Sequence, residues 1–481
     1  MGVTRVVQNA LNSGELSPRL TLREDYEKYA NGLKTLRNFQ PLPTGGAITQ
    51  YGQQWTAQTK DAALAYLLPF EFSTTQAYVI EAGNLYFRFY KDGGRIFDIS
   101  GTVAAMVNNG AGLIRVTDVA HGLVTGDYAY ISGVVGTDEA NGEWVVTRID
   151  ADTFDLQGSA FSHTYTSGGT WYRPYQITTT YVVADIPTIK FAQSADTLYL
   201  VHPLYAPRKL TRTGHTAWTL SVIDFLDGPY MDVNTTPTRL TPSAATMPAG
   251  TAITGAADNG AGLIRITAVA HTLITGDPVT VKDVEGTSEA NGNWIVTQID
   301  ANTVDLQGSV FVNTWVSDGN IALCRTLTAS AIEGINNNTG FLASDVGRLI
   351  RIKETGVWGY VEIVKVTSTT VVRVNIVNTL TNTNAKKTWR LGAFSTNSGF
   401  PSAVTIFEQR LCYGATSAEP QNTWLSTIGS YEDFTPTATS GTVADSDAVT
   451  YKLGSNKVNK IQWLSGACQL YLGTAGEEFS M

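Results

Sequence analysis

The stretch VAHGLVTGDYAYI (Val119–Ile131) returns in the same chain as VAHTLITGDPVTV (Val269–Val281). It belongs to a longer repeat, because residues 109–161 align without a gap with residues 259–311, at a constant offset of 150 (259 − 109). Roughly two-thirds of the aligned positions are identical, which indicates an internal duplication.

Each copy has the pattern of five short strands, which in the first copy are LIRVT, DYAYIS, EWVVTRI, TFDLQG and GGTWY. Asn141-Gly142 and Asn291-Gly292 predict a tight turn before the third strand. Apolar positions are retained while intervening positions change, as expected where alternate residues face a closed interior. We therefore predict two small β-barrels. The retained positions are Ile114, Trp144, Val146, Ile149 and Leu156, which recur as Ile264, Trp294, Val296, Ile299 and Leu306, whereas Tyr130, Ser132 and Arg148 become Thr280, Lys282 and Gln298.

Almost everything after Gly45 has the pattern of short strands separated by Gly, Asn-Gly and Asp-Gly, so an all-β fold is expected. Two hairpins are predicted, one in residues 84–97 with Asp92-Gly93-Gly94 at its tip and one in residues 359–377. Three segments share a form typical of propeller blades, with a short strand, a polar turn and a Leu-rich strand. They are residues 189–220, 404–426 and 458–480, and the third stops part-way.

The front of the chain has a different pattern. TLREDYEKYANGLKTLRNF (residues 21–39) predicts a short helix that Asn31-Gly32 interrupts and the following QPLPTGG ends. A helix this short is not stable alone and needs a partner surface, on its own subunit or on another. We predict that it is a docking element, with a candidate docking interface formed by Leu22, Tyr26, Tyr29, Leu33, Leu36 and Phe39.

Composition excludes several classes of function. The net charge is −9 and 16% of residues are charged, so the surface is expected to repel a nucleic-acid backbone. No window approaches the roughly 18 apolar residues of a membrane span, and the first residues lack the apolar core of a signal peptide. The three cysteines, Cys324, Cys412 and Cys468, give neither a disulfide framework nor a metal site and are expected to be buried residues in a reducing cell.

A histidine and an aspartate recur together in both copies, as His121 with Asp127 and His271 with Asp277. One reading is a general base oriented by a carboxylate. The other is a structural corner, in which the histidine caps a strand end and the aspartate fixes a turn. We favour the structural corner, because neither copy supplies a nucleophile or a leaving-group partner.

The remaining motifs give no catalytic or metal site. The stretches DADTFD (residues 150–155) and DANTVD (residues 300–305) have some of the spacing of a calcium loop, but the further ligands do not follow, so hairpin turns are expected. We find no phosphate-binding glycine loop and no hydrolase or protease motif. No catalytic residue, no cofactor and no metal are predicted, and the chain is not expected to be an enzyme. A carbohydrate-cleaving pair of carboxylates stays open, since residues such as Glu477 and Glu478 cannot be paired from sequence.

Several stretches resemble a family of bacteriophage tail proteins, the tail tubular or nozzle proteins of short-tailed phages. Residues 13–47, with NF...LP.GGA near their end, are similar to the opening of that family, and residues 340–352 and 387–434 are similar to its central region. The duplicated barrels resemble modules called FCCH, after a small β-barrel of ubiquitin-activating enzymes. The glycine loop of those enzymes is missing here, so their chemistry is not expected.

This resemblance implies a virion structural protein, made in the host cytoplasm and assembled into the phage tail. It implies a homohexameric ring below the portal and its adaptor, a conduit for DNA ejection that touches DNA without reading its sequence, and contact with tail fibres. The competing reading is a glycan-binding or glycan-cleaving virion surface protein with propeller and barrel modules.

The expected organisation follows from these patterns. Residues 1–46 form the N-terminal arm and helix, 47–102 the first part of a β body, 103–172 the first barrel, 173–252 propeller-like blades, 253–324 the second barrel, 325–395 a β-rich domain, and 396–481 further blades that stop part-way.

Overall fold

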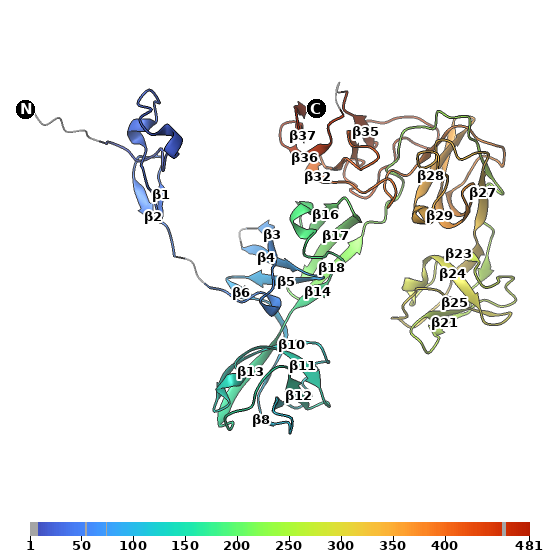
Figure 1. The fold of residues 1–481 in the computed structure, drawn as a ribbon. Coiled ribbons are helices and arrows are strands. Elements are labelled where there is room, and N and C mark those ends of the chain that lie inside the picture. The colour runs from blue at the N-terminus through green and yellow to red at the C-terminus, as the bar shows by residue number, and fades with distance from the viewer. Residues whose placement is uncertain (1–7, 53–54, 74, 455–457) are drawn as a thin grey trace, which may run out of the picture. The chain divides into compact units, whose positions relative to one another are not determined.

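The computed structural model describes residues 8–52, 55–73, 75–454 and 458–481 (Figure 1). By its internal contacts the chain forms two units, residues 1–58 and residues 59–481. The fold is all-β, as predicted, and consists of small antiparallel sheets. Among the described residues the helical segments are three-residue 3-10 helices, and none of them is long and apolar enough to cross a membrane.

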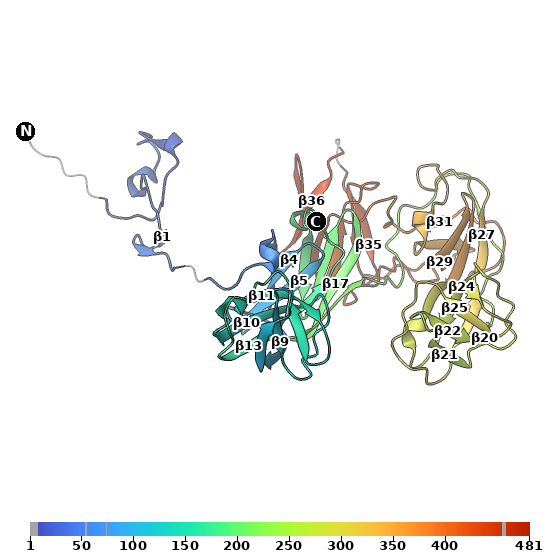
Figure 2. The same cartoon turned by 60° about the horizontal axis from the view of Figure 1, so that its bottom comes forward.

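The two repeats fold into seven-stranded sheets with the same strand order. Figure 2 shows both barrels from a second side. All five strands predicted in each copy are present, and two further strands precede them. The first barrel has the order β7-β13-β10-β11-β12-β9-β8 and the second has β20-β26-β23-β24-β25-β22-β21. The strands of the first are β7 Phe97–Thr102, β8 Ala105–Asn108, β9 Ile114–Thr117, β10 Tyr128–Val135, β11 Gly142–Arg148, β12 Thr153–Leu156 and β13 Ser167–Pro174. Those of the second are β20 Thr251–Ala252, β21 Gly255–Asp258, β22 Ile264–Thr267, β23 Pro278–Lys282, β24 Gly292–Gln298, β25 Thr303–Leu306 and β26 Asn320–Leu323.

A single bent segment closes each barrel. β7 and β8 lie at opposite ends of the strand order but follow each other in the chain. The Val103 amide donates to the Gly169 carbonyl on one side (3.0 Å), and the next amide, Ala104, donates to Thr117 on the other (2.9 Å). Ile253 and Thr254 repeat this pattern in the second copy with bonds to Gly319 and Thr267. The predicted closed interior therefore depends on strands that lie before the recognisable repeat.

Two details of the repeat prediction are wrong. The connection from β10 to β11 contains the 3-10 helix η4 Asp138–Ala140, and the Asn141 side chain bonds both backbone groups of Val134, so Asn-Gly does not form a tight turn there. Ile149 and Ile299 are 45% and 46% exposed. Both follow the last residue of a strand, where the alternation that points side chains into the barrel has ended.

The barrel cores differ by a coupled pair of residues. In the first barrel the buried Trp171 donates its indole N–H to an Asp118 carboxylate oxygen at 2.7 Å. The second barrel has the apolar residues Ile321 and Ala268 at these two positions. A buried indole N–H needs an acceptor, and an aliphatic side chain does not, so the two positions change together.

Four small sheets form the propeller-like body, and their strands follow the chain in a meander. The first, β14-β5-β4-β3, is interrupted by the first barrel, and the predicted hairpin at Asp92-Gly93-Gly94 lies within it. The others are β15-β16-β17-β18, β32-β33-β34-β35 and β36-β37-β38. Their bounds are β3 Tyr66–Ser73, β4 Gln76–Gly83, β5 Tyr86–Lys91, β6 Gly94–Arg95, β14 Gln176–Thr178, β15 Lys190–Ser194, β16 Thr197–His202, β17 Tyr205–Gly214, β18 Ala217–Val222, β32 Ala403–Phe407, β33 Arg410–Gly414, β34 Asn422–Leu425, β35 Val449–Lys452, β36 Ile461–Gly466, β37 Leu470–Thr474 and β38 Glu478–Ser480.

Successive blades pack through their first strands and share apolar clusters. β32 lies beside both β15 and β36. The Gln193 side chain on β15 makes two hydrogen bonds, both 3.0 Å, to the backbone of Glu71 on β3. One core cluster joins Phe70 and Phe89 of the first blade to Trp218 of the second, and similar clusters join the second blade to the third and the third to the fourth. Each blade thus covers a face of its neighbour, as in a propeller.

A further sheet has six strands in the order β19-β27-β30-β29-β28-β31. The second barrel is inserted between β19 and β27, and the predicted hairpin of residues 359–377 is β29 and β30. The bounds are β19 Leu240–Pro242, β27 Arg325–Ala329, β28 Leu349–Glu354, β29 Val357–Ser368, β30 Val371–Asn378 and β31 Trp389–Leu391. Its core is mostly aliphatic, with Ile350, Val361, Ile363, Val372 and Val374 all fully buried, and it also contains Phe341 and Trp389.

The predicted N-terminal helix is wrong. Residues 18–32 form a series of i→i+3 turns, which include the 3-10 helices η1 Pro18–Leu20 and η2 Tyr29–Asn31, and a hairpin of β1 Phe39–Pro41 and β2 Ala47–Thr49 follows. Leu22 has a positive φ of 66°, and the Leu33 backbone pairs with residues 14 and 16. None of the periodic apolar side chains is fully buried in its own unit, so packing does not offset the cost of nucleating a helix.

The prediction of buried cysteines holds for two of three. Cys324 and Cys412 are buried, and burial raises the pKa of their thiols to about 11 and about 12. Cys468 is exposed, because it lies in the turn between β36 and β37, where the chain reverses at the end of the hairpin. The prediction was wrong there because turn positions of a hairpin lie outside the sheet faces that become buried.

We predict that Asp118→Ala destabilises the first barrel by about 1–3 kcal/mol, because it leaves a buried indole N–H without an acceptor. In a Trp171→Phe background, which has no such N–H, the same change costs only a few tenths of a kcal/mol. Hydrogen exchange of β12 and β13 amides measures the opening free energy of this barrel in the full chain. Equal costs in both backgrounds would contradict the coupling.

Candidate functional site

The predicted docking residues lie in the N-terminal unit, and backbone pairing positions them instead of a helix. The Leu33 amide donates to the Gly14 carbonyl at 2.8 Å, and the Leu36 amide donates to a carboxylate oxygen of Glu15 at 2.7 Å. Three of the six residues are exposed and three are half-buried. The exposed ones are Leu22, Tyr26 and Phe39, and the half-buried ones are Tyr29, Leu33 and Leu36.

Three further apolar side chains of this unit were missed by the sequence reasoning. Tyr51 is 88% exposed and Trp55 is 74% exposed, and Ile48 on β2 is also exposed. Among the residues of this unit that the structure describes, no hydrophobic side chain is buried. The available signal was two large aromatic residues, Tyr51 and Trp55, in an otherwise polar stretch that follows the predicted helix. The unit thus presents apolar surface without having a core of its own.

The histidine and the aspartate that recur in both copies each accept a hydrogen bond from a backbone amide two or three residues away in the same loop. The His121 Nδ1 atom accepts from the Leu123 amide at 3.0 Å, and its Nε2 atom lies 3.2 Å from the Asp150 carbonyl. Asp127 accepts from the Val124 amide at 3.0 Å and pairs with Arg173. In the second copy, His271 accepts from Leu273 and Asp277 accepts from Ile274. These contacts close turns, which is the structural role favoured for these residues.

The two acidic stretches also form turns. Asp150 accepts from the amides of Asp152 and Thr153, both at 2.8 Å, and these bonds lower the pKa of its carboxyl group. Asp155 is held by Arg115 at 2.6 Å, and this pairing lowers the pKa of Asp155. Asp300 and Asp305 repeat both arrangements. Within the described residues, no group of three or more His, Cys, Asp or Glu side chains is placed to hold a metal ion.

The first barrel is anchored to the first blade by a buried ionic cluster. Glu143 on β11 pairs with Arg88 and with Arg95, both at 2.6 Å, and the two arginine side chains are 0% and 6% exposed. Tyr128 on β10 donates to Asp61 at 2.8 Å. A buried guanidinium without its carboxylate is strongly unfavourable, so Glu143 fixes the barrel to the blade.

The second barrel uses the same position with different chemistry. Asn293, the counterpart of Glu143, donates to Glu362 on β29 at 2.6 Å. Burial raises the pKa of Glu362 to about 7, the Asn293 bond opposes this shift, the Asp224 carboxylate adds to it, and Lys282 opposes it. The same position of the duplicated module therefore contacts the neighbouring sheet in both copies, through a carboxylate in the first copy and through an amide in the second.

Comparisons with known proteins give little more. The chain matches no known family and no curated protein. One similar solved structure is a phage phi92 endosialidase, with 12% identity, coverage of 86% of this chain and 63% of that one, and a TM-score of 0.17. The chain thus spans less than two-thirds of that protein's length. A likeness at this score supports no argument about fold or function, so the function has to be argued from the chain's own residues.

We predict that Glu143→Ala loosens the first barrel from its blade at a cost of about 3–5 kcal/mol, because two buried guanidinium groups lose their carboxylate. Asn293→Ala removes one hydrogen bond and costs about 1–3 kcal/mol. Limited proteolysis of the full chain measures the loosening, at the junctions near Phe97 and Pro174 for the first barrel and near Thr251 and Leu323 for the second. Equal protease sensitivity of the two variants would contradict this account of the anchor.

Glu362 also predicts a dependence of stability on pH. Its pKa is raised in the folded chain, so ionisation is penalised there, and stability falls as pH rises from about 4.5 through about 7. Glu362→Gln keeps an acceptor for Asn293 and has no proton to lose. The variant should gain on the order of 2–3 kcal/mol over the wild type between pH 5 and pH 8.

Urea unfolding at pH 5 and at pH 8 measures this gain. Glu71→Gln, at an exposed position of β3, is the matched control. A difference between Glu362→Gln and wild type that does not change with pH would refute the prediction.

Proposed function

We propose that the chain is a structural subunit of the tail of a short-tailed phage, in the ring-shaped tube or nozzle below the portal and its adaptor. The observation that carries the proposal is the N-terminal unit, whose described residues expose large apolar side chains and bury none. A surface of this kind is stabilised when a partner covers it. The proposed partners are the adaptor and further copies of the chain.

The sequence resemblance of residues 13–47, 340–352 and 387–434 to tail tubular proteins supports this assignment. The duplicated barrels support it in a second way, because each is a closed module with its own core that is inserted between strands of the body. Modules inserted in this manner can be presented to tail fibres without altering the body. The proposed ring has six copies, in which each subunit contributes two different faces to head-to-tail contacts.

The proposed role is passive and non-enzymatic. DNA passes through a conduit whose wall makes few favourable contacts with phosphate, and the net charge of −9 and the low content of charged residues are consistent with such a wall. No reactive side chain is needed for this role. The location in the virion follows from the same proposal.

The assembly can be tested by native mass measurement of the full chain, alone and with a portal–adaptor complex of a short-tailed phage. We expect a six-fold complex on the adaptor. The triple variant Leu22→Ser, Tyr51→Ser and Trp55→Ser should weaken this association by at least about tenfold, because exposed apolar anchors carry much of an interface's energy.

The matched control is Val119→Ser, which changes a side chain that is 74% exposed on the first barrel. It should associate as the wild type does. A wild-type chain that stays monomeric and ignores the adaptor would contradict the proposal. So would a triple variant that assembles normally.

A further inference from the structure

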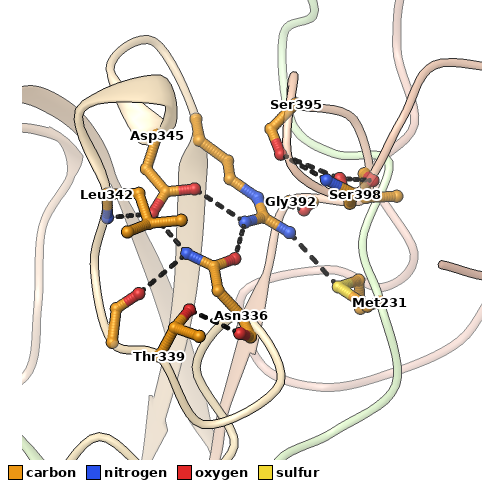
Figure 3. A network of polar contacts seen from close by, with 11 residues as sticks. Met231, Asn336, Thr339, Leu342, Asp345, Gly392, Ser395 and Ser398 are labelled. Atoms are coloured by element: carbon orange, nitrogen blue, oxygen red, sulfur yellow. Dashed lines mark hydrogen bonds and ion pairs between the residues drawn. The ribbon is translucent and has the colours of Figure 1, made fainter. Parts of the chain in front are cut away.

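The polar network next to β28, drawn in Figure 3, has a buried ion pair at its centre. Arg348 pairs with Asp345 at 2.9 Å and donates to the Asn336 amide oxygen at 2.7 Å. The two charged side chains are 1% and 0% exposed. Separation of the pair would leave two buried charges, so this network opens only when its sheet unfolds.

Residues 59–63, which precede β3, are held by contacts of a different kind, and we call this segment the strap. The Thr59 hydroxyl donates to the Ala63 carbonyl at 2.7 Å, and the Ala62 amide donates to the Thr59 carbonyl at 3.0 Å, so the two ends of the strap are drawn together. Asp61 and Ala62 have positive φ angles of 56° and 53°. This backbone region is unfavourable for residues other than glycine, so contacts outside the strap have to hold it.

The first blade supplies one set of these contacts. The Lys60 amide donates to Glu81 Oε1 at 3.0 Å, and the Lys60 ammonium lies 4.7 Å from the centroid of the Tyr86 ring on β5. The Tyr86 hydroxyl donates to the same Glu81 carboxylate at 2.5 Å, and Glu81 is 1% exposed. A buried carboxylate and an aromatic face therefore fix the blade side of the strap.

The first barrel supplies the other set through one residue of β10. The Lys60 ammonium also lies 4.7 Å from the centroid of the Tyr128 ring, and the Tyr128 hydroxyl donates to the Asp61 carboxylate at 2.8 Å. The ammonium is thus held by one ring of the blade and by one ring of the barrel. Pro278 stands at the equivalent position of the second barrel, so the ring and its hydroxyl belong to the copy beside the strap.

The strap therefore depends on two parts of the molecule at once. Its strained backbone conformation is stable only while the contacts on both sides are in place. We propose that the strap is a conformational switch, which is closed while the first barrel lies on its blade and opens when the barrel moves away.

Opening of the strap changes the connection to the N-terminal unit, which ends at residue 58. The hydrogen bonds from Thr59 to Ala62 and Ala63 keep the closed strap short. Once they are released, residues 59–63 can extend to at most about 17 Å. A movement of the first barrel thus gives the N-terminal unit a longer connection to the body. The switch does not require the proposed ring assembly, so it can be tested on the free full chain.

Hydrogen exchange of the Ala62 and Ala63 amides measures opening of the strap. Lys60→Met removes the cation between the two rings and should raise exchange at both amides by about tenfold. Coupling between two parts is reciprocal, so the same variant should also raise exchange where the chain enters and leaves the first barrel. The reporters there are the Ile96 amide, which donates to the Phe89 carbonyl, and the Tyr175 amide, which donates to the Ile96 carbonyl, both at 2.9 Å.

Two hydroxyl groups on β10 give a matched pair of variants. Tyr128→Phe removes the donor to Asp61 and should raise exchange in the strap and at Ile96 and Tyr175 by about fivefold, the effect of one hydrogen bond. Tyr130→Phe, in a ring that stacks on Phe97, is the control and should leave all of these amides unchanged.

The Leu342 amide, which donates to Asp345 at 2.8 Å within the network of Figure 3, is the reference for an intact fold. Its exchange should be the same in every variant. Tyr128→Phe removes a single hydroxyl group and preserves the test if Lys60→Met unfolds the chain. Unchanged exchange in the strap would overturn the proposal. Faster exchange in the strap without any change at Ile96 and Tyr175, or an equal response to Tyr128→Phe and Tyr130→Phe, would also overturn it.

Discussion

The structure depends on one constraint, which is that a sheet of a few short strands cannot bury enough apolar surface to be stable alone. Each blade of the body therefore shares its core with a neighbour. Phe70, Phe89 and Trp218 link the first two blades, and Cys412 and Leu472 link the last two. The barrels satisfy the same constraint differently, since a bent strand closes each sheet upon itself.

The duplicated barrel shows how one module can be attached to two hosts. Most interior positions stay apolar in both copies, although Trp171 and Asp118 are replaced by Ile321 and Ala268. Other changes lie where a copy meets its own surroundings. Glu143 faces two buried arginines, and its counterpart Asn293 faces a buried carboxyl group. A carboxylate at position 293 would place a third carboxyl group beside Glu362 and Asp224, so the amide is the side chain that this junction tolerates.

Much of the fold could be predicted from the sequence, and the reasons are local. Alternation and turn residues identify the strands of the barrels and the hairpins at Asp92-Gly93 and residues 359–377. The strands that close the barrels were missed, because they precede the repeat and differ between the copies. Helical spacing at Leu22 and Tyr26 was misleading, since spacing becomes a helix only when something packs on it. The contact of Asn293 with Glu362 joins segments that lie far apart in the chain and leaves no motif in the sequence.

The blades and barrels bury their apolar faces, whereas the N-terminal unit leaves its apolar side chains exposed. The central claim is that a partner covers this unit. Its described residues have exposed apolar side chains, a two-stranded hairpin and no core. The most direct measurement is hydrogen exchange of residues 8–52 in the free chain and in the assembled particle. The account predicts rapid exchange in the free chain and strong protection after assembly. Equal exchange in the two states would show that no partner covers this surface, and would contradict the account.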